Sequence, residues 1–190
     1  MKIGFENEYF VAGSDGTPLQ TVPYDLPHDA AGTLVEVRSD AGDDPQTVLT
    51  SFKSRYAELE RAIINKGLML LNLAVCDKVI FNGHPETAGF HIHFSNPQWN
   101  HSTWPLNHYY YDWPTIHDNP PKEVAEMLEQ LNGVFKPYYD GVPRHPHIWR
   151  PKTWGWEYRR LPATIDPGIV AKHLTELYYP AVRTPRKKVA

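Results

Sequence analysis

In the segment GFENEYF, residues 4–10, acidic and aromatic side chains fall at alternate positions. In a strand, residues two apart point to the same side of the sheet, so Glu6 and Glu8 share one face. Phe5 and Tyr9 share the opposite face, which is apolar. The alternation therefore predicts a strand with one packed face and one acidic face.

Three further segments repeat this division into an apolar face and a polar face. Their polar members are Glu36 and Arg38 in residues 33–38, His91 and His93 in residues 90–95, and Glu157 and Arg159 in residues 155–161. Together with the two glutamates of the first strand, these eight positions hold no lysine, serine or threonine, which an ordinary solvated sheet face would include. If the four strands share one sheet, carboxylates, imidazoles and guanidiniums gather on a single face.

The remaining elements predict an α+β fold. Helices are expected over residues 44–67, 121–136 and 166–179, and a further strand over residues 68–74. The first and third helices begin with an Asp-Pro pair, which places an N-cap residue before proline at the first helical position. Because strands and helices do not alternate regularly, an antiparallel or mixed sheet with helices packed on one face is favoured over a doubly wound fold.

The composition is that of one domain that contains no disulfide framework. The chain has 190 residues, 41% hydrophobic residues, a formal net charge of −3, ten histidines and one cysteine. We expect a single domain over residues 1–182 and a basic tail over residues 183–190. The single cysteine excludes zinc sites built on several cysteines, and the acidic balance argues against nucleic-acid binding. MKIGFENEYF does not resemble a signal peptide and no apolar run approaches the ~20 residues of a membrane span, so we expect a cytoplasmic protein without a membrane partner.

The polar face has two explanations. Carboxylates that converge on one face repel one another unless cations neutralise them, and hard divalent metals with oxygen ligands are the usual answer. Arginines beside them supply planar forks for phosphate or carboxylate, so the combination is typical of a nucleotide-phosphate site. The alternative is a solvated face laced with ion pairs, which is the commoner explanation for any one strand taken alone.

The motifs, taken in order, resemble the glutamine synthetase and glutamate–cysteine ligase superfamily. The matching stretches are GFENEYF for its opening E-x-E strand, VEVRSD for the second acidic strand, TAGFHIHFS for the H-x-H strand and WEYRRLPAT for the late E-x-R strand. The amino-acid sequences of these motifs are most similar to those of the small, often phage-encoded type 2 carboxylate–amine ligases, the amidoligases. The resemblance implies a curved antiparallel or mixed sheet like the glutamine synthetase catalytic domain, with helices on one face and the active site on the other.

The resemblance also implies cofactors and their ligands. Carboxylates would hold Mg²⁺ or Mn²⁺, namely Glu6, Glu8, Glu36 and Glu157. His91 and His93 would contact the phosphates of ATP, or His91 would complete one metal shell. Imidazole is less usual on Mg²⁺ than on Zn²⁺ or Mn²⁺, which favours phosphate contact for at least one of the two.

The arginines receive roles by the same resemblance. Arg159 and Arg160 would stabilise the transferring phosphoryl group, and Arg38 would hold the substrate carboxylate or a phosphate. Arg144 and Arg150 correspond to the basic approach to the last strand and would contact the nucleotide. In a regular strand Arg160 points to the apolar side, which makes it the weaker assignment.

The implied reaction joins a carboxylate to an amine at the expense of ATP. The partners would be a small-molecule or peptide carboxylate and an amine acceptor, in the cytoplasm or, for a phage-encoded enzyme, in the host cytoplasm. Self-association into a homo-oligomer stays open. The aromatic segment 97–118, which carries Trp99 and Trp113, is either a lid that excludes water from an acyl phosphate or a packing and interface element.

Three alternatives to the ligase remain. A metal-dependent hydrolase would use the two histidines and a carboxylate around zinc, although the chain lacks an H-E-x-x-H helix. A guanidino kinase would use the same catalytic sheet for phosphoryl transfer. A non-catalytic binding or structural protein would be the outcome if the polar face had degenerated, and the presence of all eight residues argues against that.

Overall fold

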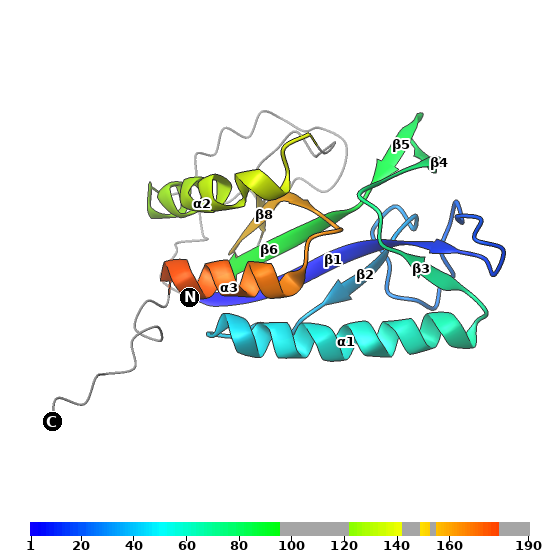
Figure 1. The fold of residues 1–190 in the computed structure, drawn as a ribbon, viewed down its shortest axis with the longest axis horizontal. Helices are drawn as coiled ribbons and strands as arrows, with labels where there is room; N and C mark the ends of the chain where they lie inside the picture. Colours follow the sequence, from blue (N-terminus) through cyan, green and yellow to red (C-terminus); the bar gives the residue numbers. More distant parts are fainter. Residues whose placement is uncertain (96–121, 142–148, 153–154, 179–190) are drawn as a thin grey trace, which may run out of the picture.

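The protein, seen here in a computed structural model, is described over residues 1–95, 122–141, 149–152 and 155–178. Its architecture is α+β, as predicted (Figure 1). The elements are β1 (Lys2–Ala12), β2 (Val35–Arg38), α1 (Pro45–Asn65), β3 (Met69–Leu71), β4 (Val75–Phe81), β5 (His84–Thr87), β6 (Gly89–Ser95), α2 (Lys122–Phe135), the 3-10 helix η2 (Lys136–Tyr138), β7 (Trp149–Lys152), β8 (Gly155–Pro162) and α3 (Pro167–Tyr178).

The main sheet has the strand order β2-β1-β6-β8-β7, and β3 pairs with the last residues of β1, Phe10–Ala12. Each of its pairings is antiparallel, which selects the antiparallel option among those predicted. The long strand β1 pairs with β2, β3 and β6, so the E-x-E segment occupies the middle of the sheet. All four strands that carry the polar pattern therefore belong to one sheet.

The three α-helices pack on one face of this sheet. Ring contacts join each helix to it: Phe52 of α1 to Phe5, Phe135 of α2 to Tyr158, and Tyr178 of α3 to Phe94. The buried side chains of the helices and of the apolar strand positions form one hydrophobic cluster. Helices α1 and α3 contact each other along the sheet (Figure 1). The polar strand positions consequently point to the opposite face.

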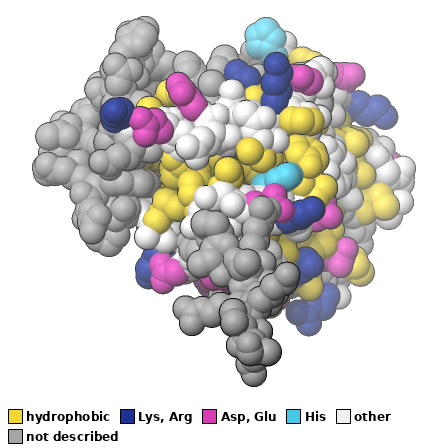
Figure 2. Space-filling model, turned by 60° about the vertical axis from the view of Figure 1, so that its left-hand side comes forward, with side chains coloured by type: hydrophobic (Ala, Val, Ile, Leu, Met, Phe, Trp, Pro, Cys, Tyr) yellow, Lys and Arg dark blue, Asp and Glu magenta, His cyan; other side chains and the backbone are white. Residues whose placement is uncertain are grey.

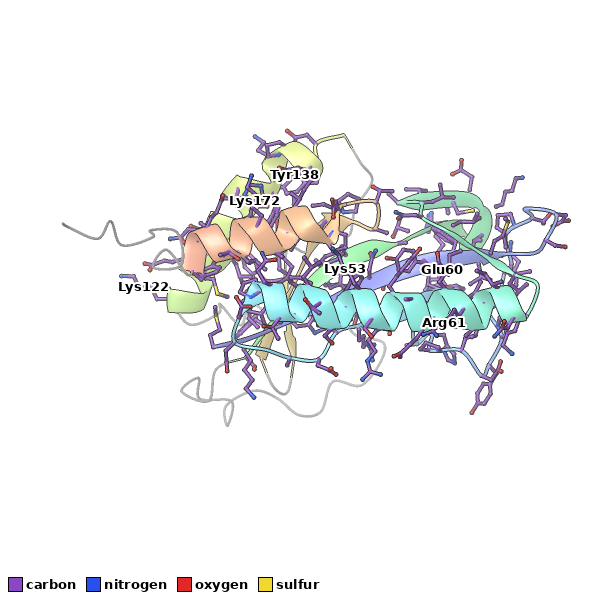
Figure 3. The ribbon with its side chains drawn as sticks, turned by 60° about the horizontal axis from the view of Figure 1, so that its bottom comes forward. Lys53, Glu60, Arg61, Lys122, Tyr138 and Lys172 are labelled. Carbon is purple, nitrogen blue, oxygen red and sulfur yellow. The ribbon has the colours of Figure 1, made fainter. Side chains whose placement is uncertain are left out.

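Helix α1 forms where its sequence signals predict. The side chain of Asp44 accepts a hydrogen bond from the backbone N–H of Thr47 at 2.8 Å, and Pro45 occupies the first helical position. The buried side is Val48, Leu49, Phe52, Leu59 and Ile63. The outer side carries the exposed Lys53, Glu60 and Arg61 (Figure 3).

The strands β4 and β5 form a hairpin outside the main sheet, which the sequence analysis did not predict (Figure 1). Its turn contains Asn82 and Gly83, with φ angles of 50° and 81°. Asn-Gly suits a turn with positive φ at both central positions because asparagine tolerates this region and glycine has no Cβ. The strand expected over residues 68–74 is accordingly wrong in extent, since only Met69–Leu71 is strand and the hairpin follows it.

The remaining outcomes concern the stretch before β8 and the segments outside the described residues. A strand that was not predicted, β7, pairs with β8 at the edge of the main sheet. The aromatic segment 97–118, Arg144 and the basic tail 183–190 lie outside the described residues. Among the helices of the described part, none is long and apolar enough to span a membrane.

Candidate metal and phosphate site

Strand register places the predicted polar side chains next to one another on the face opposite the helices. Across neighbouring strands, Glu6 lies opposite Arg38 and His91, Glu8 opposite Glu36, and Glu157 opposite His93 and Arg150. With the addition of Arg159, we call this set the polar face. Figure 2 shows acidic, basic and histidine side chains that meet on one surface beside apolar side chains.

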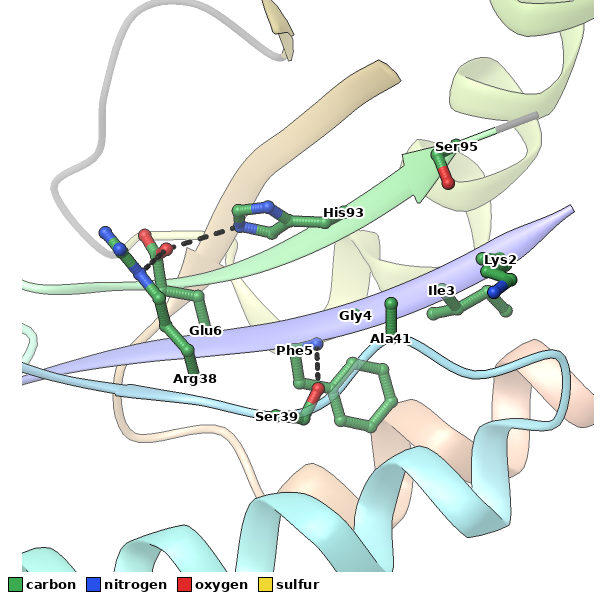
Figure 4. A pocket seen from close by; sticks show the side chains of 10 residues that line it. All are labelled: Lys2, Ile3, Gly4, Phe5, Glu6, Arg38, Ser39, Ala41, His93 and Ser95. Atoms are coloured by element: carbon green, nitrogen blue, oxygen red, sulfur yellow. Dashed lines mark hydrogen bonds and ion pairs between the residues drawn. The ribbon is translucent and has the colours of Figure 1, made fainter. Parts of the chain in front are cut away.

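Glu6 is the centre of the polar face. One carboxylate oxygen lies 2.9 Å from Nδ1 of His91, and the other lies 2.7 Å from Nε of Arg38 and 3.5 Å from Nε2 of His93 (Figure 4). Arg38 also donates to Glu36, the carboxylate two residues before it. Glu6 thus links residues from β1, β2 and β6.

Glu157 of β8 is a second centre and is fully buried. Arg150 of β7 donates to both of its oxygens, from Nε at 2.8 Å and from Nη2 at 3.0 Å. Nε of Arg159 lies 3.3 Å from Glu157, and Nδ1 of His91 lies 3.1 Å from it. His91 therefore bridges two buried carboxylates, Glu6 and Glu157.

Glu8 differs from its neighbours because no basic side chain in the described residues forms an ion pair with it. Its carboxylate accepts the backbone N–H of Gly89 at 2.8 Å. Position 89 favours glycine because a Cβ there would lie 2.8 Å from Nε2 of His91. The glycine before the H-x-H strand therefore leaves room for the imidazole that the carboxylates orient.

Two groups of ligand atoms on the polar face have the spacing of a metal site. One comprises Glu6, His91, His93 and Glu157, and the other Glu6, Glu8 and Glu36, with the ligand atoms of each group within 4.8 Å of one another. The all-carboxylate group offers the oxygen donors that Mg²⁺ and Mn²⁺ prefer, and the mixed group suits Mn²⁺ or Zn²⁺. Their donor sets therefore fit divalent cations. A metal bound to these groups would replace Arg38 and Arg150 as the partner of the carboxylates that the two arginines contact.

Burial and mutual repulsion separate the pKa values of the glutamates. Burial raises the pKa of Glu36 to about 7, and the charge of Glu6 adds to this effect against the opposing charge of Arg38. Burial also raises the pKa of Glu8, although the charge of His91 and the N–H of Gly89 oppose it. For Glu6, burial acts in the same direction, but the hydrogen bond and charge of His91 with the charges of His93 and Arg38 lower the pKa to about 2. The polar face thus contains two carboxylates whose charge a bound cation would stabilise, Glu36 and Glu8, and one whose charge the protein already stabilises, Glu6.

The cations of the face respond to the same surroundings. Burial lowers the pKa of His91, but the charge of Glu8, the hydrogen bond with Glu6 and the charge of Glu157 outweigh it, and the net shift is upward. Burial and the charge of Arg150 lower the pKa of Arg159. Perturbed groups gathered in this way are typical of functional sites as well as of ion-pair networks.

The raised pKa of Glu36 predicts how the metal-free protein responds to pH. Between the ordinary pKa of 4.5 and the folded value of about 7, the folded state binds more protons than the unfolded state, so stability falls as pH rises through this window. Glu36→Gln should therefore stabilise the protein by roughly 1–3 kcal/mol at about pH 8 and by less than about 1 kcal/mol near pH 5. Urea unfolding with EDTA at both pH values measures this.

Glu129→Gln, on the exposed side of α2, is the matched control and should change stability equally at the two pH values. A gain for Glu36→Gln that is the same at both pH values would contradict the assigned shift.

Two cavities adjoin the polar face at its ends. One of about 160 Å³ lies between Gly4, Glu6, Arg38 and His93 (Figure 4). The other, of about 360 Å³, is reached beyond Glu8 and is lined also by His91 and Arg159. Ligands thus have space on both sides of the carboxylates.

Some residues fall outside the expected pattern. Arg160 is not brought to the polar face, since its guanidinium lies 5.5 Å from the ring centroid of Tyr139 on the helix side. Arg150 belongs to the sheet itself, because β7 sets it opposite Glu157. Asp29 and Glu86, which line the larger cavity, were not predicted. The Asn-Gly turn was the available signal for the hairpin that carries Glu86.

The chain matches no family model, and it matches no curated protein. The chemistry of the polar face therefore carries the functional assignment.

Proposed function

We propose that the protein is an ATP-dependent carboxylate–amine ligase that uses Mg²⁺ or Mn²⁺. One observation carries this proposal: four carboxylates, two imidazoles and three guanidiniums lie side by side on one face of an antiparallel sheet, in two potential metal groups that share Glu6. Metal and phosphate chemistry needs these residue types together. The order of the motifs along the chain supports the same assignment.

In the proposed reaction an oxygen of the acid substrate attacks the γ-phosphorus of ATP. The bond between that phosphorus and the bridging oxygen breaks, ADP leaves with the electron pair, and an acyl phosphate remains. The nitrogen of the amine then attacks the acyl carbon. The carbon–oxygen bond to phosphate breaks, inorganic phosphate leaves, and the nitrogen loses a proton to give the amide.

Each group of residues has a role in this scheme. Glu6, Glu8, Glu36 and Glu157 would hold the metal, which neutralises phosphate charge when bound. Arg159, which reaches the larger cavity, would stabilise the transferring phosphoryl group. Arg38 and Arg150, which pair with the metal carboxylates in the metal-free protein, would turn to phosphate or substrate carboxylate when the metal replaces them.

The direct test is calorimetric titration with a non-hydrolysable ATP analogue, with Mg²⁺ or Mn²⁺ and with EDTA. We expect binding that requires the metal. Absence of binding under both conditions sinks the ligase assignment.

The mixed group of two imidazoles and two carboxylates favours a second candidate, a metal-dependent hydrolase. Such ligands suit Zn²⁺, which activates water without a nucleotide. A titration with Zn²⁺ alone, run beside the analogue titrations, separates the candidates: the hydrolase predicts tight binding of Zn²⁺ and no metal-dependent binding of the analogue.

A further inference from the structure

The larger cavity has walls from four parts of the chain. They are the loop before β2, the β4–β5 hairpin, the beginning of β6 and the end of β8, which contribute Asp29, Glu86, Gly89 and Leu161 among others. Glu8, His91 and Arg159 line the cavity and also belong to the polar face. A ligand in this cavity therefore lies directly beside the proposed site of phosphoryl transfer.

Two carboxylates of this cavity are held by neutral donors. Glu86 accepts the hydroxyl of Thr33 at 3.1 Å and the N–H of Thr87 at 3.0 Å. Asp29 accepts the N–H groups of Thr33 and Leu34 at 2.9 and 3.0 Å. Among the described residues, no basic side chain forms an ion pair with either carboxylate. Neutral donors therefore hold both carboxylates in place, and within the described residues neither has a basic partner that balances its charge.

His91 provides a second observation that points to a ligand. Its side chain is 4% exposed, and its Nδ1 faces Glu6 and Glu157. Its Nε2 has no hydrogen-bond partner within the described parts of the chain, and it lies beside Gly89 on the wall of the cavity. This nitrogen is therefore open to a partner in the cavity.

The charge of the lining selects the kind of ligand. Three carboxylates face the cavity, from Glu8, Asp29 and Glu86, against two basic side chains, Arg159 and His91, both of which already contact Glu157. The carbons of Leu34, Phe81 and Leu161 complete the walls and suit an aliphatic chain. A ligand with its own carboxylate would be repelled, whereas an alkyl ammonium would match both the charge and the apolar walls.

We propose that this cavity binds the acceptor amine of the ligase as its ammonium, with Glu86 as the main counter-ion, and that the acceptor is an aliphatic primary amine without a neighbouring carboxylate. The naming of the ligand as the acceptor rests on the proposed function. Its recognition as an alkyl ammonium rests on the cavity alone.

The test titrates the full chain with butylamine, butan-1-ol and 2-aminopentanoate, by NMR or calorimetry. Butylamine should bind at least about tenfold more tightly than the uncharged alcohol or the amino acid, and Glu86→Gln should remove most of that preference. Asp77→Asn, an exposed carboxylate on the same hairpin, is the matched control and should bind butylamine like the unaltered chain. Equal affinity for butylamine and butan-1-ol, or unchanged butylamine affinity in a folded Glu86→Gln variant, overturns the proposal.

The comparison of the three probes on the unaltered chain decides the question even if Glu86→Gln folds poorly. The ATP-analogue titration is run on the same samples, and Glu86→Gln should keep metal-dependent analogue binding. Butylamine selectivity without analogue binding would contradict the ligase assignment and still support an ammonium-binding cavity. Analogue binding without butylamine selectivity would support the ligase assignment and contradict the ammonium-binding cavity.

Discussion

Replacing Glu8 with glutamine is expected to weaken metal-dependent binding of an ATP analogue at least about a hundredfold, because even groups that only support a metal ligand contribute 10–100-fold. Glu8 belongs to the all-carboxylate metal group and has no basic partner of its own in the described residues. Its charge would therefore be balanced by the metal and not by the protein. Glutamine keeps an oxygen to accept the N–H of Gly89 but supplies no charge to a cation.

The stability of the same variant separates a binding site from a structural ion-pair network. The raised pKa of Glu8 shows that burial disfavours its charge in the metal-free protein, so Glu8→Gln should melt at the same temperature as the unaltered chain or higher. Calorimetric titration measures the affinity and thermal unfolding with EDTA measures the stability.

Glu60→Gln, on the exposed side of α1, serves as the control and should change neither quantity. Glu8→Gln with intact analogue affinity and a much lower melting temperature would assign Glu8 to structure and remove the support for a metal at this position.

Replacing Gly155 with alanine is expected to have the largest effect on folding. A Cβ at this position would lie 1.8 Å from the carbonyl oxygen of Phe94 and 2.8 Å from its carbonyl carbon. These are backbone atoms of β6, so the clash cannot be relieved by a side-chain rotation. β8 would have to move away from β6, and with it Glu157 would leave His93. We expect a loss of at least about 3 kcal/mol, in the range that marks backbone strain or a disrupted core.

The control for this variant is a glycine with open space around it. Gly133 lies on the exposed side of α2, with no atom within 4 Å of a Cβ placed there. Gly133→Ala should stabilise the protein by about 0.5–1 kcal/mol, since alanine loses less backbone freedom than glycine in a helix. Urea unfolding compares the two, and a Gly155→Ala variant as stable as the unaltered chain would show that β8 does not approach β6 this closely.

Local spacing explains what was predictable. The alternation around Glu6 and around His91 depends only on the two-residue repeat of a strand, so the division into apolar and polar faces follows from the sequence. Helix α1 follows from Asp44, Pro45 and an apolar stripe, all within one segment. An α+β fold with helices on one face of an antiparallel or mixed sheet was predictable for this reason, and strand pairing alone made the sheet antiparallel.

Long-range pairing explains what was missed. Arg150 stands in a segment with weak strand signals, and only its pairing with β8 sets it against Glu157. Glu86 and Asp29 are far apart in the sequence, and both reach Thr33 only when the hairpin folds beside the loop before β2. Arg160 is next to Arg159 in the chain but lies on the helix side, over Tyr139.

Which side chains leave the core follows from the amino-acid order of each strand, because a strand directs alternate residues to opposite faces whatever its partners are. Which of those side chains meet depends on how the strands pair. Strand register puts Glu6 between Arg38 and His91. Burial raises the pKa of both Glu6 and Glu36, but the hydrogen bond and charge of His91 and the charge of Arg38 lower that of Glu6 overall. Interaction between charges depends on distance and on exclusion of water, and both arise only when strands distant in sequence pair.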